Sequence, residues 1–397
     1  MKIHGFSHAL PRAFFQSAGN PSRVKHRVNG ISPARHQEGG TAAMLVTTTV
    51  ALLGAFAPHA TAGGPGSGPL DVAAGTTTAI NTTQVYNSIA IHDGSALTVG
   101  SGGNVDVAGG ISSSGELQVL GGGYLESGPV YNGHAYVGTQ PASILISGAG
   151  SKMVVNYWSH GTNPASPGTV PYDDGSMYGG RDLPGTITIS DGGKLEILGA
   201  GWGADFSNYG PRVPGLYLGG SPWAAMSVGT AGELNGDGGF IHSNVFVYDL
   251  GIVSPGDPGA ANSTGTINIT GGGNLTFNGG QFNVDVKNPG EGDRLNFTEG
   301  GNLTFANPIV LKLWLAQEVI DAGVFDVNVV MGADSIVGFD QSHVSVAGLD
   351  SGWTVDFLVT NGTGTLRGTF VPEPSTYALW GGVASLLGAL CLRRRKR

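Results

Sequence analysis

Apolar and polar residues alternate in short segments through the middle of the chain, and a Gly-rich turn precedes each segment. The alternation is clear in Leu97–Val99, Leu117–Val119 and Leu195–Ile197. A period of two residues indicates a strand with one buried face and one face toward water. Only residues 315–321 suggest one or two helical turns. The pattern therefore predicts an all-β fold.

The segments recur at regular spacings. Leu97 and Val105 lie 8 residues apart, and the same pair recurs 20 residues later at Leu117 and Leu125. Residues 144–155 repeat the unit with one residue added. Further pairs are Ile187 with Leu195, Ile267 with Leu275, and Leu295 with Leu303, the last two at an offset of 28.

Two architectures fit these spacings. Each Gly-rich turn either closes an antiparallel hairpin, which leads to a β-sandwich, or bends the chain by about a third of a circle, which leads to a parallel β-helix. A recurrence of 20 residues matches one coil, and the offset of 28 matches a coil with an inserted loop. Asn104, Asn274 and Asn302 follow glycines, where we expect left-handed backbone and Asn ladders between coils. We favour the β-helix.

The segment 250–286 carries G-x-x-S-P-G followed by G-T-x-x-I and a strand. It resembles the passenger domains of autotransporters, and residues 93–305 share this style. The resemblance implies a right-handed parallel β-helix. Residues 306–370 lose the repeat and contain longer strand-like segments, so we expect a β-rich C-terminal cap there. Residues 63–92 are predicted to form a linker and an N-terminal cap.

Composition narrows the classes of function. The chain has 397 residues, 70 of them Gly, and Cys391 is its single cysteine, so neither an intrachain disulfide nor a thiolate metal site is expected. Residues 63–370 contain eight basic and 26 acidic residues. This acidic balance argues against a nucleic-acid partner. No cofactor is indicated.

The N-terminus has the order of a secretory signal. Basic residues precede an apolar run at 44–57, and Ala60 and Ala62 occupy the small-residue positions of a cleavage site. We expect residues 1–62 to be a signal peptide with an extended basic region, exported by the Sec machinery and cut after Ala62. The alternative is a buried core helix.

The C-terminal sequence predicts a marginal membrane anchor. A Val371-Pro372-Glu373-Pro374 segment precedes an apolar run, which is shorter than the ~20 residues of a comfortable span. Aromatic residues suit the outer interface and Arg residues the cytoplasmic side. The predicted anchor residues are Tyr377, Trp380, Leu386, Leu387, Leu390, Arg393, Arg394 and Arg395.

This order of motif, apolar helix and Arg-rich end, over residues 371–397, resembles the PEP-CTERM sorting signal of Gram-negative bacteria. The resemblance implies that an exosortase in the inner membrane recognises Pro372-Glu373-Pro374, cleaves nearby and releases or transfers the protein. It also implies a host that exports polysaccharide into a biofilm or floc. The alternative is a plain C-terminal anchor.

Two loop-like inserts, 156–182 and 202–226, interrupt the repeats and are rich in aromatic residues. Exposed rings stack on sugars, so these inserts are candidates for glycan binding. Alternatively, the rings pack the loops onto the coils. The candidate residues are Tyr157, Trp158, Tyr172, Tyr178, Trp202, Tyr217 and Trp223.

Catalysis and metal binding have weaker support. Asp173 and Asp174, near His160 and Arg181, suit a polysaccharide lyase or glycoside hydrolase, but adjacent turn residues usually point apart. Residues 102–110 weakly resemble Ca²⁺-binding repeats, but we favour plain turns as their explanation.

The sequence therefore predicts a non-enzymatic protein that is transiently anchored in the inner membrane and then reaches the cell surface or the extracellular matrix. There we expect it to serve as an adhesin or structural component that holds exopolysaccharide. A carbohydrate-active enzyme on the same scaffold is the alternative.

Overall fold

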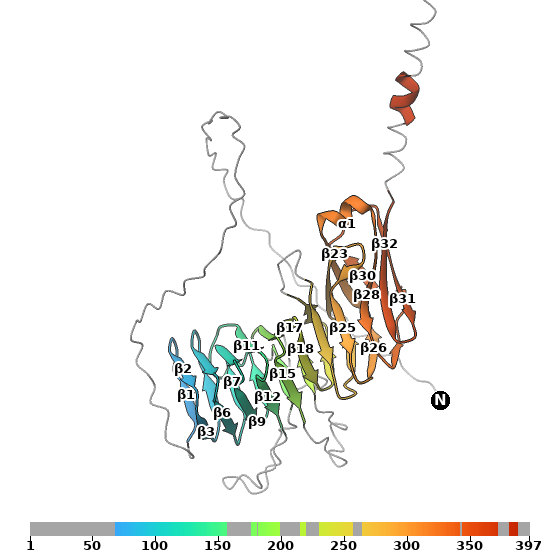
Figure 1. The fold of residues 1–397 in the computed structure, drawn as a ribbon. Helices are drawn as coiled ribbons and strands as arrows, with labels where there is room; N and C mark the ends of the chain where they lie inside the picture. The colour runs from blue at the N-terminus through green and yellow to red at the C-terminus, as the bar shows by residue number, and fades with distance from the viewer. Residues whose placement is uncertain are drawn as a thin grey trace, which may run out of the picture. The chain divides into compact units, whose positions relative to one another are not determined.

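The structure is a computed structural model that describes residues 68–156, 176–180, 182–198, 215–219, 230–256, 264–341, 344–371 and 381–387. From residue 70 to residue 370 the chain winds through three sheets in turn, and each coil contributes one strand to each sheet. Figure 1 shows the coils following one another from the blue strands β1–β3 to the orange and red strands β28–β32.

We name the three sheets A, B and C in the order in which a coil enters them. The strands of sheet A are β1 (Leu70–Val72), β4 (Ile89–Ile91), β7 (Ile111–Ser113), β10 (Val130–Asn132), β13 (Met177–Gly179), β16 (Leu216–Leu218), β19 (Val245–Val247), β22 (Leu275–Asn278), β26 (Asn302–Asn307) and β29 (Ser335–Val337).

The strands of sheet B are β2 (Thr77–Ile80), β5 (Ala96–Val99), β8 (Glu116–Leu120), β11 (Ala142–Ser147), β14 (Gly185–Ser190), β17 (Gly232–Gly236), β20 (Gly251–Pro255), β23 (Gln281–Asn288), β27 (Ile309–Leu315) and β30 (Val344–Ala347), with β24 (Glu291–Gly292) beside β23. The strands of sheet C are β3 (Thr83–Tyr86), β6 (Asn104–Val107), β9 (Tyr124–Ser127), β12 (Lys152–Val155), β15 (Lys194–Ile197), β18 (Gly239–His242), β21 (Thr266–Ile269), β25 (Arg294–Phe297), β28 (Val324–Met331), β32 (Thr363–Phe370) and β31 (Trp353–Thr360).

The pairing between successive coils is parallel, which confirms the β-helix interpretation and excludes the sandwich of hairpins. The predicted 20-residue recurrence equals the length of one coil, because residues 20 positions apart pair in adjacent strands: Leu97 with Leu117, and Val105 with Leu125. The 28-residue offset is likewise the length of one longer coil, because Leu275 pairs with Leu303 in the adjacent strand. The extra residues of that coil lengthen β23 and form its antiparallel return β24.

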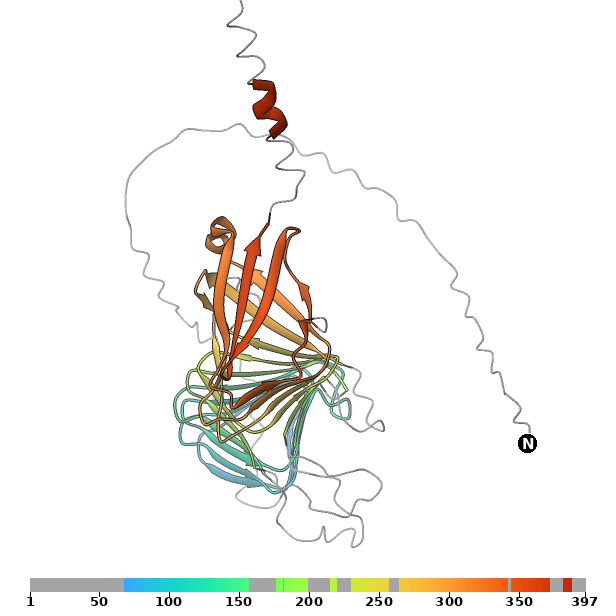
Figure 2. The ribbon, with the colours of Figure 1, turned by 90° about the vertical axis from the view of Figure 1, so that its right-hand side faces the viewer.

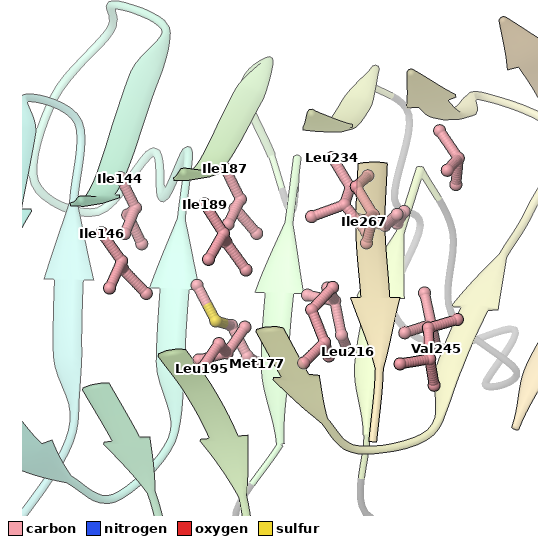
Figure 3. Close-up of a cluster of buried hydrophobic side chains, with 14 of the residues drawn as sticks. Ile144, Ile146, Met177, Ile187, Ile189, Leu195, Leu216, Leu234, Val245 and Ile267 are labelled. Carbon is pink, nitrogen blue, oxygen red and sulfur yellow. The ribbon is translucent and has the colours of Figure 1, made fainter. Parts of the chain in front are cut away.

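The alternating apolar residues point inward and form one core. Leu97, Leu117 and Ile144 stack in successive strands of sheet B and are fully buried. Figure 3 shows the same arrangement further along, where residues from neighbouring coils converge in the interior. Burying one such side chain contributes about 1.5–3 kcal/mol, so the repeated coils can supply stability without disulfides.

The similar sequence units do not all occupy the same faces. The pair Ile187 and Leu195 lies on β14 and β15, at the corner between sheets B and C. The pair Ile267 and Leu275 lies on β21 and β22, at the corner between sheets C and A. The Gly-rich turn therefore serves different corners of the coil, which the sequence spacing alone does not distinguish.

The expectation that Asn adopts left-handed backbone at these turns was wrong. Among the described residues, Asp191 and Asn361 are the only non-glycine residues with positive φ. Glycines one or two residues before the asparagines take that conformation instead, with φ of 68° at Gly272 and 110° at Gly301. Glycine has no Cβ and adopts this backbone without strain, so the following Asn is free to begin the next strand.

The boundaries of the solenoid are wider than predicted. Its first coil begins at Leu70, inside the segment assigned to a linker and N-terminal cap. At the other end, parallel pairing continues through β29 and β30, beyond residue 306. The expected cap is formed by α1 (Gln317–Ala322), which follows β27, and by the antiparallel strands β28, β32 and β31. Figure 2 shows these orange and red strands side by side.

Candidate functional site

The outer face of sheet A is nearly free of charge. In each short strand the central residue points outward, and successive strands place these residues in one row along the solenoid. Among the described residues, the strands of sheet A contain no Lys or Arg and a single acid, Asp71. The row runs through Tyr131, Tyr178, Tyr217, Phe246, Thr276, Thr304 and Val337.

Four aromatic rings stack in this row. The ring centroids of Tyr131 and Tyr178 are 5.5 Å apart, those of Tyr178 and Tyr217 are 5.4 Å apart, and those of Tyr217 and Phe246 are 5.0 Å apart. The rings are within 16–17° of parallel. The stack stiffens the middle of sheet A, since such ring pairs contribute about 0.5–1.5 kcal/mol beyond burial.

Two of the predicted glycan-binding residues belong to this stack. Tyr178 and Tyr217 lie in strands β13 and β16 rather than in loops, and only 4% and 3% of their surface is exposed. Because their ring faces lie against neighbouring rings, these two residues support the surface and are not themselves open to a sugar. The other five candidates, Tyr157, Trp158, Tyr172, Trp202 and Trp223, lie outside the described residues, as do His160, Asp173, Asp174 and Arg181.

Where the aromatic stack ends, sheet A is hollowed into a shallow groove of about 490 Å³. Half-exposed Phe246 lies at one end of it, and the floor is built from strands β19, β22, β26 and β29. The lining residues are Asn244, Phe246, Asn274, Thr276, Asn302, Thr304, Ser335 and Val337.

One wall of the groove is an asparagine ladder. The Asn274 Nδ2 donates to Asn244 Oδ1 at 3.0 Å, and the Asn302 Nδ2 donates to Asn274 Oδ1 at 3.0 Å. The same oxygens accept the backbone N–H groups of Asn274 and Asn302. The hydroxyl of Ser335 continues the ladder by donating to Asn302 Oδ1. The predicted ladder is thus confirmed for Asn274 and Asn302.

The third asparagine of that prediction lies elsewhere. Asn104 begins β6 on sheet C, where its register partners are Thr83 and Tyr124, so it has no asparagine above or below it. The prediction failed there because the Gly-Asn pair precedes a strand of a different sheet.

Carboxylates border the groove at the turns that lead into sheet A. The Glu299 Oε2 accepts the N–H of Gly271 at 2.7 Å, and the Asp334 Oδ2 accepts the N–H of Gly301 at 3.0 Å. Asp334 directly precedes the lining residue Ser335. The groove therefore has an uncharged floor beside a negatively charged rim.

A second group of acids is buried between sheets B and C. Asp293, 1% exposed, accepts the backbone N–H of Gly265 at 2.8 Å and that of Asp285 at 2.9 Å. Burial raises the pKa of Asp293 to about 8, although the two backbone N–H groups act in the opposite direction. Burial also raises the pKa of Asp285 to about 6. Since both residues lie away from solvent, they do not form an accessible acid–base pair, and Asp293 links one coil to the preceding one through Gly265.

Asp106, from the segment considered for Ca²⁺, lies on the outer face of sheet C in register with Glu126. Glu126 accepts the hydroxyl of Tyr124 at 2.7 Å, and Lys152 pairs with Glu196 at 2.8 Å on the same face. Within the described part of the chain, no group of three or more His, Cys, Asp or Glu residues is placed to hold a metal ion.

The predicted sorting residues lie mostly outside the described residues: Ala60, Ala62, Pro372, Glu373, Pro374, Tyr377, Trp380, Leu390, Arg393, Arg394 and Arg395. Val371 is described, and its N–H donates to the carbonyl of Gly352 at 2.6 Å. Leu386 and Leu387 belong to a helical segment, residues 381–387, and are exposed. Among the described residues, no helix has both the length and the apolar character needed to cross a membrane.

Within the described residues, these observations define a three-sided parallel β-solenoid with a groove on the nearly uncharged outer face of sheet A. No model of a known protein family matches the chain, and a comparison with curated proteins finds no significant match.

Sequence reasoning missed Tyr131, Phe246, Thr276 and Thr304. Phe246 lies outside both aromatic inserts, in the short segment Val245–Val247, whose alternation is too brief to stand out. The threonines belong to strands that were recognised, but their outward direction gained meaning only once the register placed them beside Phe246.

Proposed function

We propose that this protein is a non-enzymatic, exported β-solenoid that holds extracellular polysaccharide on the outer face of sheet A. The observation that carries the proposal is the groove, which combines a half-exposed aromatic ring with rows of amide and hydroxyl groups. Sugars are recognised by this combination, because ring C–H groups stack on aromatic faces and hydroxyls pair with amides and hydroxyls.

The proposal is non-enzymatic because of the chemistry of the lining. Glycoside hydrolysis requires two carboxyl groups facing the scissile bond, and the groove lining contains no carboxyl group or imidazole. The two carboxylates at the rim, Glu299 and Asp334, accept backbone N–H groups of the turns. The lining offers hydrogen bonds and one ring face, which is the chemistry of binding.

The two termini support export and surface placement as part of the same proposal. The signal-like order of residues 1–62 and the PEP-CTERM-like order of residues 371–397 favour Sec export, temporary anchoring in the inner membrane and processing by an exosortase. The body would then remain on the cell surface or in the matrix. We also infer that the solenoid is right-handed, since connections between parallel strands of one sheet are right-handed in nearly all proteins.

The proposal is tested with the full chain and the exopolysaccharide of the cells that produce it. Retention of wild-type protein on the immobilised polysaccharide is measured together with the release of reducing ends or unsaturated sugars. We expect retention without product. In the Phe246→Ala variant, retention should fall at least tenfold, because the single exposed ring of the groove is lost.

Phe240→Ala is the matched control. Phe240 is also half-exposed and lies on the strand just before that of Phe246, but on sheet C, where Lys194 lies over its ring. Its removal should leave retention unchanged. Equal losses in the two variants would contradict the assignment to sheet A, and product formation in the wild-type assay would replace binding with catalysis.

A further inference from the structure

The chemistry of the groove indicates which class of polysaccharide it fits, an inference that rests on the proposed function. Its floor carries amides, hydroxyls and one ring, with no positive charge anywhere in the described strands of sheet A. A polysaccharide rich in uronic acids needs basic partners, and Glu299 and Asp334 at the rim would repel it. Charge therefore selects a neutral glycan.

The arrangement of hydrogen-bond donors and acceptors also favours one direction for a bound glycan chain. The amides of Asn244, Asn274 and Asn302 form one row, and the hydroxyls of Thr276 and Thr304 continue the row of Phe246. Both rows run along the solenoid and repeat once per coil, at a strand spacing of about 4.8 Å. This spacing is close to the length that one pyranose unit adds to an extended β-1,4-linked chain.

The row groups retain capacity for a ligand. Each Asn amide has two N–H donors, and the ladder uses one of the two in Asn274 and Asn302. Within the described part of the chain, no hydrogen bond engages the hydroxyls of Thr276 and Thr304, and both side chains are half-exposed. A sugar chain lying along the rows would meet one amide and one hydroxyl at each of the two middle coils, those of Asn274 with Thr276 and Asn302 with Thr304.

We propose that the groove on sheet A binds a neutral, extended β-linked polysaccharide aligned with the solenoid axis, with one sugar unit per coil and a terminal unit in contact with Phe246. The occupant is defined by the absence of basic residues, the acidic rim and the repeat length. An acidic polysaccharide and a compact helical α-glucan both fail at least one of these criteria.

The test compares four soluble probes with the full chain by affinity electrophoresis and isothermal titration calorimetry: hydroxyethyl cellulose, cellohexaose, maltohexaose and alginate. We expect binding to hydroxyethyl cellulose and cellohexaose, with at least tenfold weaker binding to maltohexaose and alginate. Affinity should increase as the β-1,4-linked oligomer is lengthened from two to four units, since four coils build the groove.

Charge variants test the position of the site. Thr276→Glu and Thr304→Glu place a carboxylate in the floor and should weaken binding of cellohexaose at least tenfold. The pair Thr276→Lys and Thr304→Lys should instead gain affinity for alginate that falls as salt is raised. Thr354→Glu and Thr354→Lys are matched controls, because Thr354 is an exposed strand residue on the cap and should change neither binding.

The outcomes separate the two proposals. If wild-type protein binds alginate more tightly than hydroxyethyl cellulose, or if the Thr276 and Thr354 variants behave alike, the neutral-glycan inference is wrong while polysaccharide binding stands. If it binds none of the probes and is not retained on the producing cells' own polysaccharide, the proposed function itself fails. Circular dichroism of each variant confirms that lost binding does not reflect lost folding.

Discussion

At the scale of single residues, Asp293 shows how a polar group is held inside a repetitive core. Its carboxyl group bonds two backbone N–H groups from different segments, and its own N–H donates to the carbonyl of Asp285. The residue thereby joins β23 to the start of β21 and satisfies backbone groups that burial would otherwise leave without partners. Its sequence context, Glu-Gly-Asp-Arg, resembles an ordinary exposed turn, so the sequence alone does not predict that Asp293 is buried.

The raised pKa of Asp293 predicts how stability depends on pH. The folded protein keeps a proton on this carboxyl up to about pH 8, whereas the unfolded chain releases it near 3.8. Stability should therefore fall as pH rises from about 4 to about 8, by at most about 1.4 kcal/mol per pH unit from this one group. Asp285 acts in the same direction up to about pH 6. The urea midpoint of unfolding should be higher at pH 5 than at pH 8.5.

Asp293→Asn removes the titration and should flatten this dependence. The variant will be less stable than wild type at pH 5, because an amide accepts only one of the two backbone N–H bonds. Asp93 does not interfere, since backbone N–H groups of Gln140 and Thr139 lower its pKa to about 2, below the measured range. An unchanged slope in the variant would show that Asp293 is ionised in the folded protein.

At the scale of elements, the turn glycines rather than the asparagines make the corners possible. At Gly301, φ is 110°, and an added Cβ would lie 2.1 Å from the carbonyl oxygen of Gly273 in the preceding coil. The backbones of adjacent coils approach closely at this corner, so a side chain there would push apart the strands that carry the groove.

Gly301→Ala should therefore destabilise the protein by about 1–3 kcal/mol, through backbone strain and the clash with Gly273. The comparison is Gly290→Ala, at a glycine without positive φ and with nothing within 4 Å of an added Cβ, which should change stability by less than about 0.5 kcal/mol. Urea denaturation of the two variants measures the difference. Equal stabilities would mean that the corner relaxes without cost.

The sequence predicted the strands and the coil, but not the site. Alternation at Leu97–Val99 and the recurrence at Leu117 are local signals, and they led to the correct architecture. The aromatic row has no such signal: Tyr131, Tyr178, Tyr217 and Phe246 lie 47, 39 and 29 residues apart, because the coils between them carry inserts of different length. Only the three-dimensional register brings these residues into one line.

At the scale of the whole molecule, the folded body continues directly into the proposed sorting signal. Strand β32 ends at Phe370, the N–H of Val371 is bonded to Gly352, and Pro372 follows at once in the sequence. No linker separates the last strand of the cap from the motif, so under the proposed function the peptidase acts immediately beside a folded surface.

Replacing Pro372, Glu373 and Pro374 with Ala should leave full-length protein in the membrane fraction of producing cells, whereas we expect wild type to be shortened and released. Pro289→Ala, in the turn between β23 and β24, controls for the loss of a proline and should be processed normally. Immunoblots of membrane and extracellular fractions distinguish the two. Normal release of the triple variant would refute the sorting assignment.

The central position of β32 in the cap has a mechanical consequence. This strand pairs antiparallel with β28 on one side and β31 on the other, and in the sequence its last residue, Phe370, leads into the C-terminal segment. If the body is held in place, a pull along β32 from that end loads both rows of hydrogen bonds in shear at the same moment. An edge strand pulled sideways would instead peel away one bond at a time. The two rows of hydrogen bonds beside β32 would thus resist tension that a C-terminal tether applied to the cap.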